Sequence, residues 1–274
     1  MKSVVLHLSV FGRHVAVVCT NDLVYSILFT CYGHLTVEPS DSPGVSYTVG
    51  QQQDRHDFFI SRVGASIVAT TVSDFIFIFE KDLTIELQYQ RPDLYFIHAA
   101  AVESDGRSAI LTAASGTGKS TTTYGLLHQG FRYLSDELAP IDLKAMTVHP
   151  YPHALCLKSE PPDPYVLPAE TLRTEATLHV PVTALPASAC TTPVKLGAVF
   201  FLDRDGQGDT TVLRIDSGEA AARLYANALN NLAHGGEGLD AAIQLTSRVP
   251  CFRLHMTDLS GAGEVIRSAL KATL

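Results

Sequence analysis

The sequence lacks the features that mark membrane, secreted and nucleic-acid-binding proteins. No stretch reaches the roughly 20 apolar residues that a membrane span requires. The first residues, 1–7, carry one lysine and only a short apolar run, so we expect no signal peptide. There is no run of basic residues, and the formal net charge of −8 argues against binding to nucleic acid. We therefore predict a cytoplasmic protein with neither membrane nor nucleic-acid partners.

Cysteine is scarce and scattered. The five cysteines are Cys19, Cys31, Cys156, Cys190 and Cys251, with no Cys-x-x-Cys pair and no Cys/His cluster of metal-site spacing. This pattern is typical of small buried side chains in a reducing compartment. Internal repeats and low-complexity tracts are also lacking. With 274 residues, of which 46% are hydrophobic, the chain is long enough for one large domain or for a small and a medium one.

The most informative stretch that is present is a glycine-rich turn, residues 113–121, which reads Ala-Ala-Ser-Gly-Thr-Gly-Lys-Ser-Thr. The apolar run 108–112 predicts a buried strand before the turn, and 122–129 predicts a helix after it. Strand, glycine-rich turn and helix in this order form a phosphate-binding loop, in which backbone N–H groups and the helix N-terminus face phosphate oxygens. The usual loop pattern has glycine at the position of Ala113.

This loop predicts a nucleotide site that takes ATP and Mg²⁺. Lys119 would reach the β- and γ-phosphates, and the Ser120 hydroxyl would bind Mg²⁺. A structural turn with an incidental lysine is the alternative. The residues expected to contact the nucleotide are those of the turn and of the helix start: Ser115, Gly116, Thr117, Gly118, Lys119, Ser120 and Thr121.

An acidic pair, Asp136 and Glu137, follows the loop by about one short helix. The segment 131–134 predicts the strand that ends at this pair. Carboxylates in this position are suited to holding Mg²⁺ and to orienting an incoming hydroxyl. A solvated turn before the next strand has the same composition, so the two interpretations compete.

His98 and Arg204 are further candidates whose roles depend on the fold. The segment 95–102 predicts an apolar strand, and a histidine in such a strand is commonly a hydrogen-bonded core residue. Arg204 follows a predicted buried strand and could stabilise transferred phosphoryl charge. Pairing with Asp203 or Asp205 on the surface is the alternative for this arginine.

The chain divides at Arg91-Pro92 into two predicted parts. Residues 1–92 predict a small α+β module without a catalytic motif, and 93–274 predict the catalytic domain. Within the module, 74–90 contains a strand-like aromatic run, but its apolar residues recur every four positions and favour a helix. In the second part, the many prolines of 159–193 exclude a long helix and predict an irregular excursion.

The histidine, the glycine-rich loop and the acidic pair resemble, in this order, the catalytic domain of the HPr serine kinase/phosphorylase family. The similar residues lie between 96 and 137. The resemblance implies an α/β fold with a mixed-sheet P-loop kinase core, of the type also seen in phosphoenolpyruvate carboxykinase. It implies ATP-dependent transfer of the γ-phosphoryl group to a hydroxyl. It also implies that Asp136 is the base toward an acceptor serine and that His98 lies near the transferred phosphate or the acceptor. With the residues interpreted above, the predicted catalytic set is Asp136, His98, Lys119 and Arg204, with Ser120 and Glu137 on Mg²⁺.

The acceptor is less well defined. The family's second signature, a segment with glycine and arginine, has no counterpart after Lys158, and Glu137 stands where the family has aspartate. The chain is more similar to the HPr-kinase-like enzymes of peptide-tailoring pathways, including those that phosphorylate lasso-peptide precursors. We therefore predict a peptide or protein serine as acceptor. A small-molecule hydroxyl kinase and a nucleotide-binding regulatory protein without transfer activity are alternatives, and homo-oligomer formation stays open because relatives are often hexameric.

Overall fold

The computed structural model describes residues 3–52, 57–114, 116–204 and 209–272. The chain is a mixed α/β protein that forms two compact units. The first unit combines Met1–Arg91 with His153–Ala184, and the second combines Pro92–Pro152 with Leu185–Leu274. In the described parts of the chain, no helix is both long enough and apolar enough to cross a bilayer.

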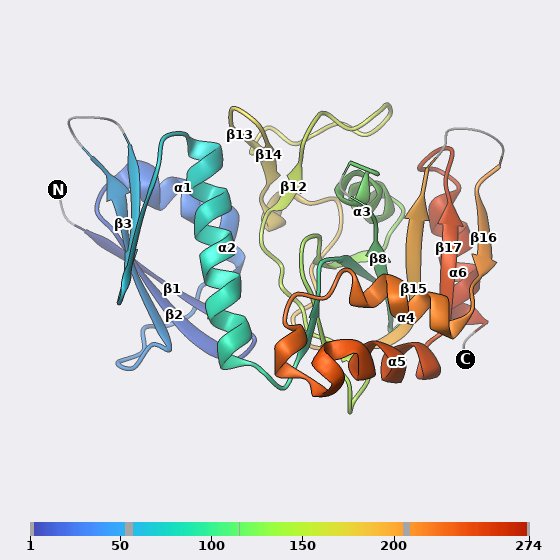
Figure 1. The fold of residues 1–274 in the computed structure, drawn as a ribbon. Helices are drawn as coiled ribbons and strands as arrows, with labels where there is room; N and C mark the ends of the chain where they lie inside the picture. Colours follow the sequence, from blue (N-terminus) through green and yellow to red (C-terminus); the bar gives the residue numbers. More distant parts are fainter. Residues whose placement is uncertain (1–2, 53–56, 115, 205–208, 273–274) are drawn as a thin grey trace. The chain divides into compact units, whose positions relative to one another are not determined.

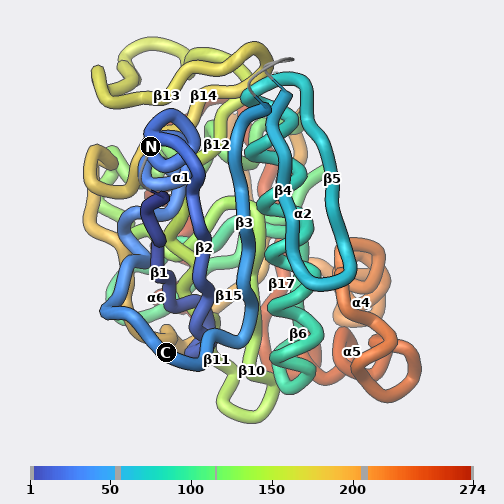
Figure 2. The backbone as a smooth tube through the Cα atoms, turned by 90° about the vertical axis from the view of Figure 1, so that its left-hand side faces the viewer, coloured from blue at the N-terminus to red at the C-terminus, as the bar shows by residue number. Residues whose placement is uncertain are grey.

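The first unit is built on a five-stranded sheet, and the helices α1 (Asp22–Tyr32) and α2 (Val72–Gln90) cover one of its faces (Figure 1). Its strands lie side by side in sequence order (Figure 2). Every pair is antiparallel except β2 with β3. Alternate strand residues are buried, as expected for a sheet with one covered face. The strands are β1 (Val4–Val10), β2 (Arg13–Cys19), β3 (Val45–Gln51), β4 (Phe58–Arg62) and β5 (Ala65–Ala69).

Helix α2 confirms the prediction made for residues 74–90. The Thr71 side chain caps its start by accepting a hydrogen bond from the Asp74 N–H at 3.0 Å. Phe75, Phe79 and Leu83 are buried at four-residue spacing, and Leu87 continues the series. The helical period extends along the whole segment, whereas the strand-like aromatic run covers only its first part, so the longer pattern prevails.

Most of the proline-rich excursion, residues 159–184, belongs to the first unit, and residues 185–193 belong to the second. The sequence-based boundary placed it in a catalytic domain of residues 93–274, whereas the structure groups His153–Ala184 with the first 91 residues. The segment His153–Ala184 forms a small antiparallel sheet in the order β12-β14-β13, made of β12 (Leu155–Leu157), β14 (Leu178–Val180) and β13 (Leu172–Arg173). Its backbone is tied to α1, because the Ala154 N–H donates to the Cys31 carbonyl at 2.7 Å.

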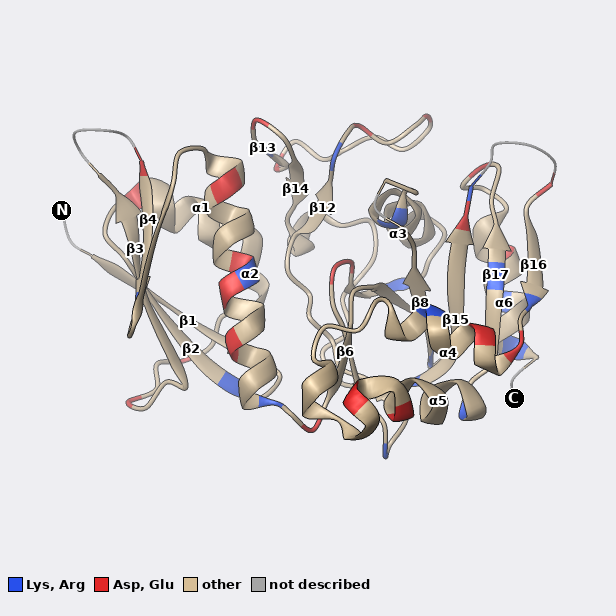
Figure 3. Ribbon diagram, viewed as in Figure 1, with Lys and Arg blue, Asp and Glu red and all other residues tan. Residues whose placement is uncertain are grey.

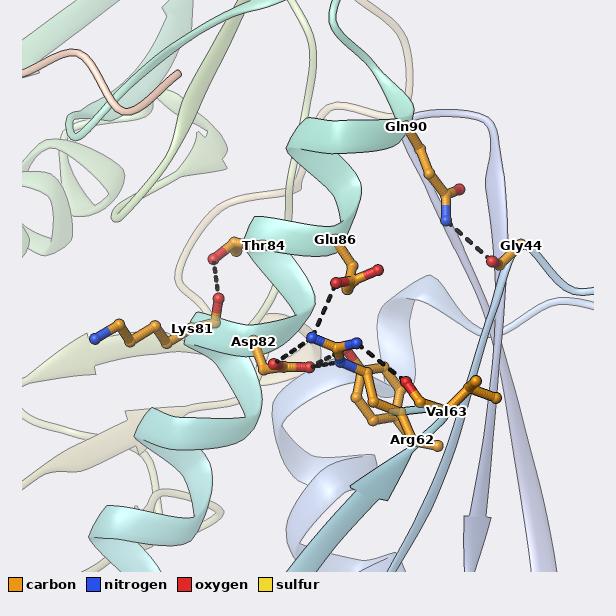
Figure 4. A network of polar contacts seen from close by, with 9 residues as sticks. Gly44, Arg62, Val63, Lys81, Asp82, Thr84, Glu86 and Gln90 are labelled. Atoms are coloured by element: carbon orange, nitrogen blue, oxygen red, sulfur yellow. Dashed lines mark hydrogen bonds and ion pairs between the residues drawn. The ribbon is translucent and has the colours of Figure 1, made fainter. Parts of the chain in front are cut away.

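An ion-pair network joins α2 to the sheet of the first unit. Acidic residues are spread along α2 (Figure 3). Arg62, at the end of β4, contacts Asp82 with Nε at 2.6 Å and Nη2 at 3.1 Å, and its Nη2 lies 3.0 Å from Glu86 Oε1 (Figure 4). The Tyr47 hydroxyl also donates to Asp82, at 2.7 Å. Partial burial alone would raise the pKa of Asp82, but hydrogen bonds from Arg62 and Tyr47 hold it below its usual value.

We expect Asp82→Asn to lower the free energy of unfolding by about 1–2 kcal/mol at pH 7, because Arg62 and Tyr47 both lose a charged acceptor. The depressed pKa means that the native carboxylate stabilises the fold above about pH 4 and loses this effect as the pH falls. The difference between parent and variant should therefore shrink in acid. Urea unfolding at pH 7 and in acid measures it, and Glu86→Gln, which keeps the contacts of Arg62 with Asp82, is the matched control.

A buried histidine gives the first unit a second dependence on pH. His179, in β14, is 5% exposed, and its Nε2 lies 2.8 Å from the Thr177 hydroxyl. Burial, assisted by the nearby His153, lowers the pKa of His179 to about 4. His153 itself is buried and lies 3.2 Å from Glu80 on α2. His179 is therefore neutral in the native state under conditions in which an unfolded chain would bind a proton.

We expect the stability of the parent protein to fall as the pH decreases from about 6.5 to about 4, by up to about 3 kcal/mol from His179 alone. The sign follows from the lowered pKa, because only the unfolded state takes up the proton within that window. His179→Gln should remove this part of the pH dependence in urea unfolding at pH 7.5 and pH 4.5, whereas His34→Gln, at an exposed site, should not. An unchanged loss of stability in His179→Gln would contradict the assignment.

The second unit is built on a nine-stranded mixed sheet in the order β6-β10-β11-β15-β8-β7-β9, with β17 beside β15 and β16 beside β17. The pairs of β15 with β8 and with β17 are parallel, and the others are antiparallel. The strands are β6 (Tyr95–Ile97), β7 (Ala100–Ser104), β8 (Arg107–Thr112), β9 (Arg132–Ser135), β10 (Ala139–Asp142), β11 (Thr147–Val148), β15 (Val194–Asp203), β16 (Thr211–Arg214) and β17 (Cys251–His255). The helices are α3 (Lys119–His128), α4 (Ser217–Tyr225), α5 (Leu239–Arg248) and α6 (Ala262–Lys271).

The core of the second unit lies around strands β6, β8 and β15 and helices α4 and α5. It includes Tyr95, Ile110, Val199, Leu224 and Leu245, each of which is fully buried. The pairing of β15 with β8 contains one irregularity: Leu196 lies opposite Ser108 and Ala198 opposite Ala109, so the residue between them stands outside the register. The pairing then continues to the C-terminal end of β8.

Candidate nucleotide site

The glycine-rich turn connects β8 to α3, as the sequence predicted. Gly116 and Gly118 have φ values of +87° and +97°, in the left-handed region that favours glycine. Gly118 is the N-cap of α3, and no side chain of the described residues caps this helix start. The Thr122 N–H donates to the Gly118 carbonyl at 2.8 Å, so the preceding N–H groups lack an acceptor within the helix. Ser115, also predicted to bind the nucleotide, lies outside the described residues.

Lys119, the first residue of α3, contacts both members of the acidic pair. Its Nζ lies 3.3 Å from Glu137 Oε2 and donates to the backbone carbonyl of Asp136. The lysine side chain is only 10% exposed. Lys119 and the acidic pair, which are separate in the sequence, therefore lie together.

His98 completes a chain of three charged or titratable groups. Its Nε2 lies 2.9 Å from Glu137 Oε2, the same oxygen that contacts Lys119. His98 directly follows β6, and its backbone N–H donates to the Asn227 carbonyl at 2.8 Å. Its side chain is 42% exposed, so the core role that an apolar strand suggested does not apply.

A tight turn after β9 sets the orientation of the two acids. The Ser135 hydroxyl donates to the Leu138 carbonyl at 2.6 Å, which closes the turn around Asp136 and Glu137. Asp136 is fully buried, and its Oδ1 accepts a hydrogen bond from the Tyr133 hydroxyl at 3.1 Å. The sequence hypothesis made Asp136 the base toward the acceptor. In the structure the Asp136 backbone carbonyl accepts a hydrogen bond from Lys119, whereas the partly exposed carboxylate of Glu137 forms an ion pair with the same lysine.

Arg204 lies beside the glycine-rich turn. A Cβ built on Gly118 would lie 3.4 Å from Arg204 Nη1. The parallel pairing of β15 with β8 explains this position: Phe201 lies opposite Thr112, so both strands end at the same edge of the sheet. Asp205, one of the alternative partners of this arginine, lies outside the described residues.

Three residues near the site were not predicted from the sequence to take part in it: Tyr133, Thr112 and Thr122. The Tyr133 hydroxyl donates a hydrogen bond to the Asp136 carboxylate. The only sequence signal for this contact is that the two residues are three positions apart. The hydroxyls of Thr112 and Thr122, on the two elements that flank the turn, are buried and have no hydrogen-bond partner among the described residues. Buried polar atoms without partners often mark the position of a water or ligand.

The residues present fit a nucleotide with Mg²⁺. Left-handed glycines, an uncapped helix start and a lysine are the features that a cradle for phosphate oxygens requires. Across the described part of the chain, no group of three or more His, Cys, Asp or Glu side chains is arranged to hold a metal ion. Mg²⁺ would therefore depend on phosphate oxygens in addition to Ser120 and Glu137, which is the usual arrangement for this ion.

Comparison with known proteins gives little further information. No family model matches the sequence, and no curated protein matches it either. Among solved structures, the HPr(Ser) kinase/phosphatase from Coxiella burnetii is similar at 10% identity and a TM-score of 0.32, over 65% of this chain and 94% of that one. A similarity at this TM-score adds no support for a shared function. The expectation of kinase activity therefore rests on the motifs and on the geometry of the site.

Proposed function

We propose that this chain is an ATP-dependent kinase that transfers the γ-phosphoryl group to a hydroxyl of a peptide or protein serine. The observation that carries the proposal is the position of the Glu137 carboxylate, which lies 3.3 Å from Lys119 and 2.9 Å from His98. It connects the lysine of a phosphate-binding turn to a partly exposed imidazole. Phosphoryl transfer needs these two functions, charge neutralisation and alignment of the acceptor, within a few ångströms.

The phosphate side of the site would consist of the turn and the start of α3. Backbone N–H groups of Gly116 to Thr121 would hold the phosphates, Lys119 would neutralise their charge, and Ser120 with Glu137 would hold Mg²⁺. Arg204, beside Gly118, would add a second positive charge at the same edge. When bound, ATP with Mg²⁺ supplies the phosphoryl group, whose transfer to an alcohol leaves ADP and one proton.

We assign that proton to His98 rather than to Asp136. A proton acceptor must reach the substrate hydroxyl directly or through one water. His98 is 42% exposed, whereas Asp136 is fully buried against Tyr133. Because the Glu137 carboxylate only accepts hydrogen bonds, His98 Nε2 carries the hydrogen, and Nδ1 has the lone pair that takes the proton. Glu137 then stabilises the imidazolium that forms.

Asp136 has a positioning role in this arrangement. Its carbonyl accepts from Lys119, and its carboxylate accepts from Tyr133, so it holds the lysine in place from the buried side. This differs from the role that the family resemblance implied for it. The two assignments predict different variants to be inactive, and they can be separated by experiment.

The test of the proposed function is an acceptor screen with γ-labelled ATP, Mg²⁺ and the full chain. One pool contains serine-bearing peptides, and the other contains small metabolites with free hydroxyl groups. We expect labelled peptide. Label on metabolites alone would replace the peptide acceptor by a small molecule. Thermal stabilisation by ATP without labelled product from either pool would refute the kinase and leave a nucleotide-binding regulatory protein.

A further inference from the structure

The strand that leads to His98 is short and lies at one end of the strand order of its sheet. β6 has three residues, and β10 pairs with one side of it. On its other side lies the segment 227–230, where the Leu229 N–H donates to the Phe96 carbonyl at 2.9 Å. Because a ladder of this length contains few hydrogen bonds, each contact on this side is a large share of what holds the strand.

The side chain of Asn230 continues the ladder at the point where the backbone leaves it. With φ −122° and ψ 42° at Asn230, the chain turns into the 3₁₀-helix Asn231–Ala233. Asn230 Oδ1 accepts from the Phe96 N–H at 2.9 Å, and Nδ2 donates to the Leu94 carbonyl at 2.8 Å. A primary amide has the same kinds of donor and acceptor as a peptide group, so this side chain takes the place of a strand residue.

The β10 side of the strand offers no substitute for these two hydrogen bonds. Phe96 lies opposite Pro140, and proline has no N–H to donate. The N–H and the carbonyl of Phe96 both bond to the segment 227–230 instead. Leu94 and Phe96 are fully buried, so water has no access with which to replace the amide of Asn230.

The position of β6 determines the position of His98, which directly follows it. The His98 N–H donates to the Asn227 carbonyl at 2.8 Å, in the same segment, and its Nε2 lies 2.9 Å from Glu137. We propose that Asn230 is a positioning residue of the transfer reaction: its amide holds β6 against the segment 227–230 and so keeps the imidazole in contact with Glu137. This inference rests on the proton-accepting role of His98 in the proposed function.

The kinetic test is a double-mutant cycle between Asn230 and His98 in the full chain. We expect Asn230→Ala to lower kcat at least about tenfold with the KM for ATP unchanged, because misplacing a reacting group by about 1 Å costs up to about 10²-fold. In the His98→Gln background the same substitution should change kcat by less than about twofold, since it acts through the imidazole. An equal fall in both backgrounds would overturn the proposal and leave Asn230 a purely structural residue.

Gln244→Ala is the matched control for the loss of an amide. Gln244 belongs to the same unit, and its Nε2 donates to the Leu143 carbonyl at 3.2 Å, so the variant also removes a hydrogen bond from a side-chain amide to the backbone. It should transfer phosphate at the parent rate.

A second measurement needs no turnover and separates this inference from the proposed function. In protein with isotopically labelled histidine, the nitrogen NMR signals of His98 are those that His98→Gln removes. Asn230→Ala should shift them toward their positions in Glu137→Gln, whereas Gln244→Ala should leave them unchanged. If the parent transfers no phosphate and Asn230→Ala still shifts these signals, the proposed function fails and the positioning of His98 stands.

Unchanged His98 signals in Asn230→Ala would overturn the inference, whatever the kinetics. If Asn230→Ala fails to fold, Asn230→Asp replaces it in both experiments. The aspartate keeps an acceptor for the Phe96 N–H and loses the donor to the Leu94 carbonyl, so the same shifts and the same dependence on His98 are expected of it.

Discussion

Replacing Lys119 with methionine is expected to lower the rate of phosphoryl transfer by about 10³-fold or more. The methionine keeps the apolar stem and removes the ammonium group, which lies 3.3 Å from Glu137 Oε2 at the end of a side chain that is only 10% exposed. Without it, the charge on the transferring group would lose a neighbouring cation, and Glu137 would lose its contact with Lys119. Turnover of γ-labelled ATP measures the rate, and the ATP-induced shift in Tm measures nucleotide binding.

Lys144→Met is the matched control, because Lys144 is an exposed lysine of the same unit. It should transfer phosphate at the parent rate and show the parent's stabilisation by ATP. Parent-like transfer by Lys119→Met would show that the turn between β8 and α3 is not the nucleotide site.

The second large effect is expected at His98. His98→Gln should lower kcat by about 10²- to 10⁴-fold, the usual contribution of a positioned proton acceptor, while ATP still stabilises the protein. Asp136→Asn should reduce kcat far less, because the backbone carbonyl that holds Lys119 remains and asparagine can still accept from Tyr133. Steady-state kinetics with a saturating acceptor compares the two variants.

The opposite ranking would restore the role that the sequence suggested. If Asp136→Asn lost transfer and His98→Gln kept it, the buried carboxylate would have to become accessible when substrates bind, and our assignment of the proton would be wrong. Glu137→Gln is a second test of the His98 assignment. It should also lower kcat, because it removes the charge that stabilises the His98 imidazolium.

The local course of the chain was predictable where one short pattern determined it. The strand before the turn and the helix after it depend on residues close together in the sequence; β8 forms as expected, whereas α3 begins at Lys119, three residues before the predicted start at 122. Helix α2 was predictable because its buried residues keep one period over its whole length. In both cases the side chains that decide the conformation are neighbours in the sequence.

The orientation of the acidic pair was not predictable in this way. Asp136 and Glu137 are adjacent, and either carboxylate suits a nucleotide site. Their difference depends on the Ser135–Leu138 turn and on the Tyr133 hydroxyl, which leave one acid buried and the other in contact with Lys119 and His98. Such a choice is made by packing and by hydrogen bonds across the fold rather than by composition.

The unit to which the proline-rich excursion belongs could not be predicted from the sequence either. Prolines predicted its irregular backbone, but they do not specify the surface on which it packs. That surface is provided by residues more than a hundred positions earlier, for example by Ser73, whose hydroxyl lies 2.6 Å from that of Thr174. Segments far apart in the chain can be joined by such contacts without any signal in either one.

The strand that precedes Arg204 contains a glycine in crowded surroundings. Gly197 is the residue that the β15–β8 ladder leaves out, and a Cβ there would lie 2.7 Å from Leu270 of α6 and 3.1 Å from Arg107 at the start of β8. A side chain at that position would require Leu270 and Arg107 to move, and beyond this residue the ladder aligns Phe201 with Thr112. A substitution at Gly197 would therefore change the packing of β15 against α6 and β8 near the start of the strand that leads to Arg204.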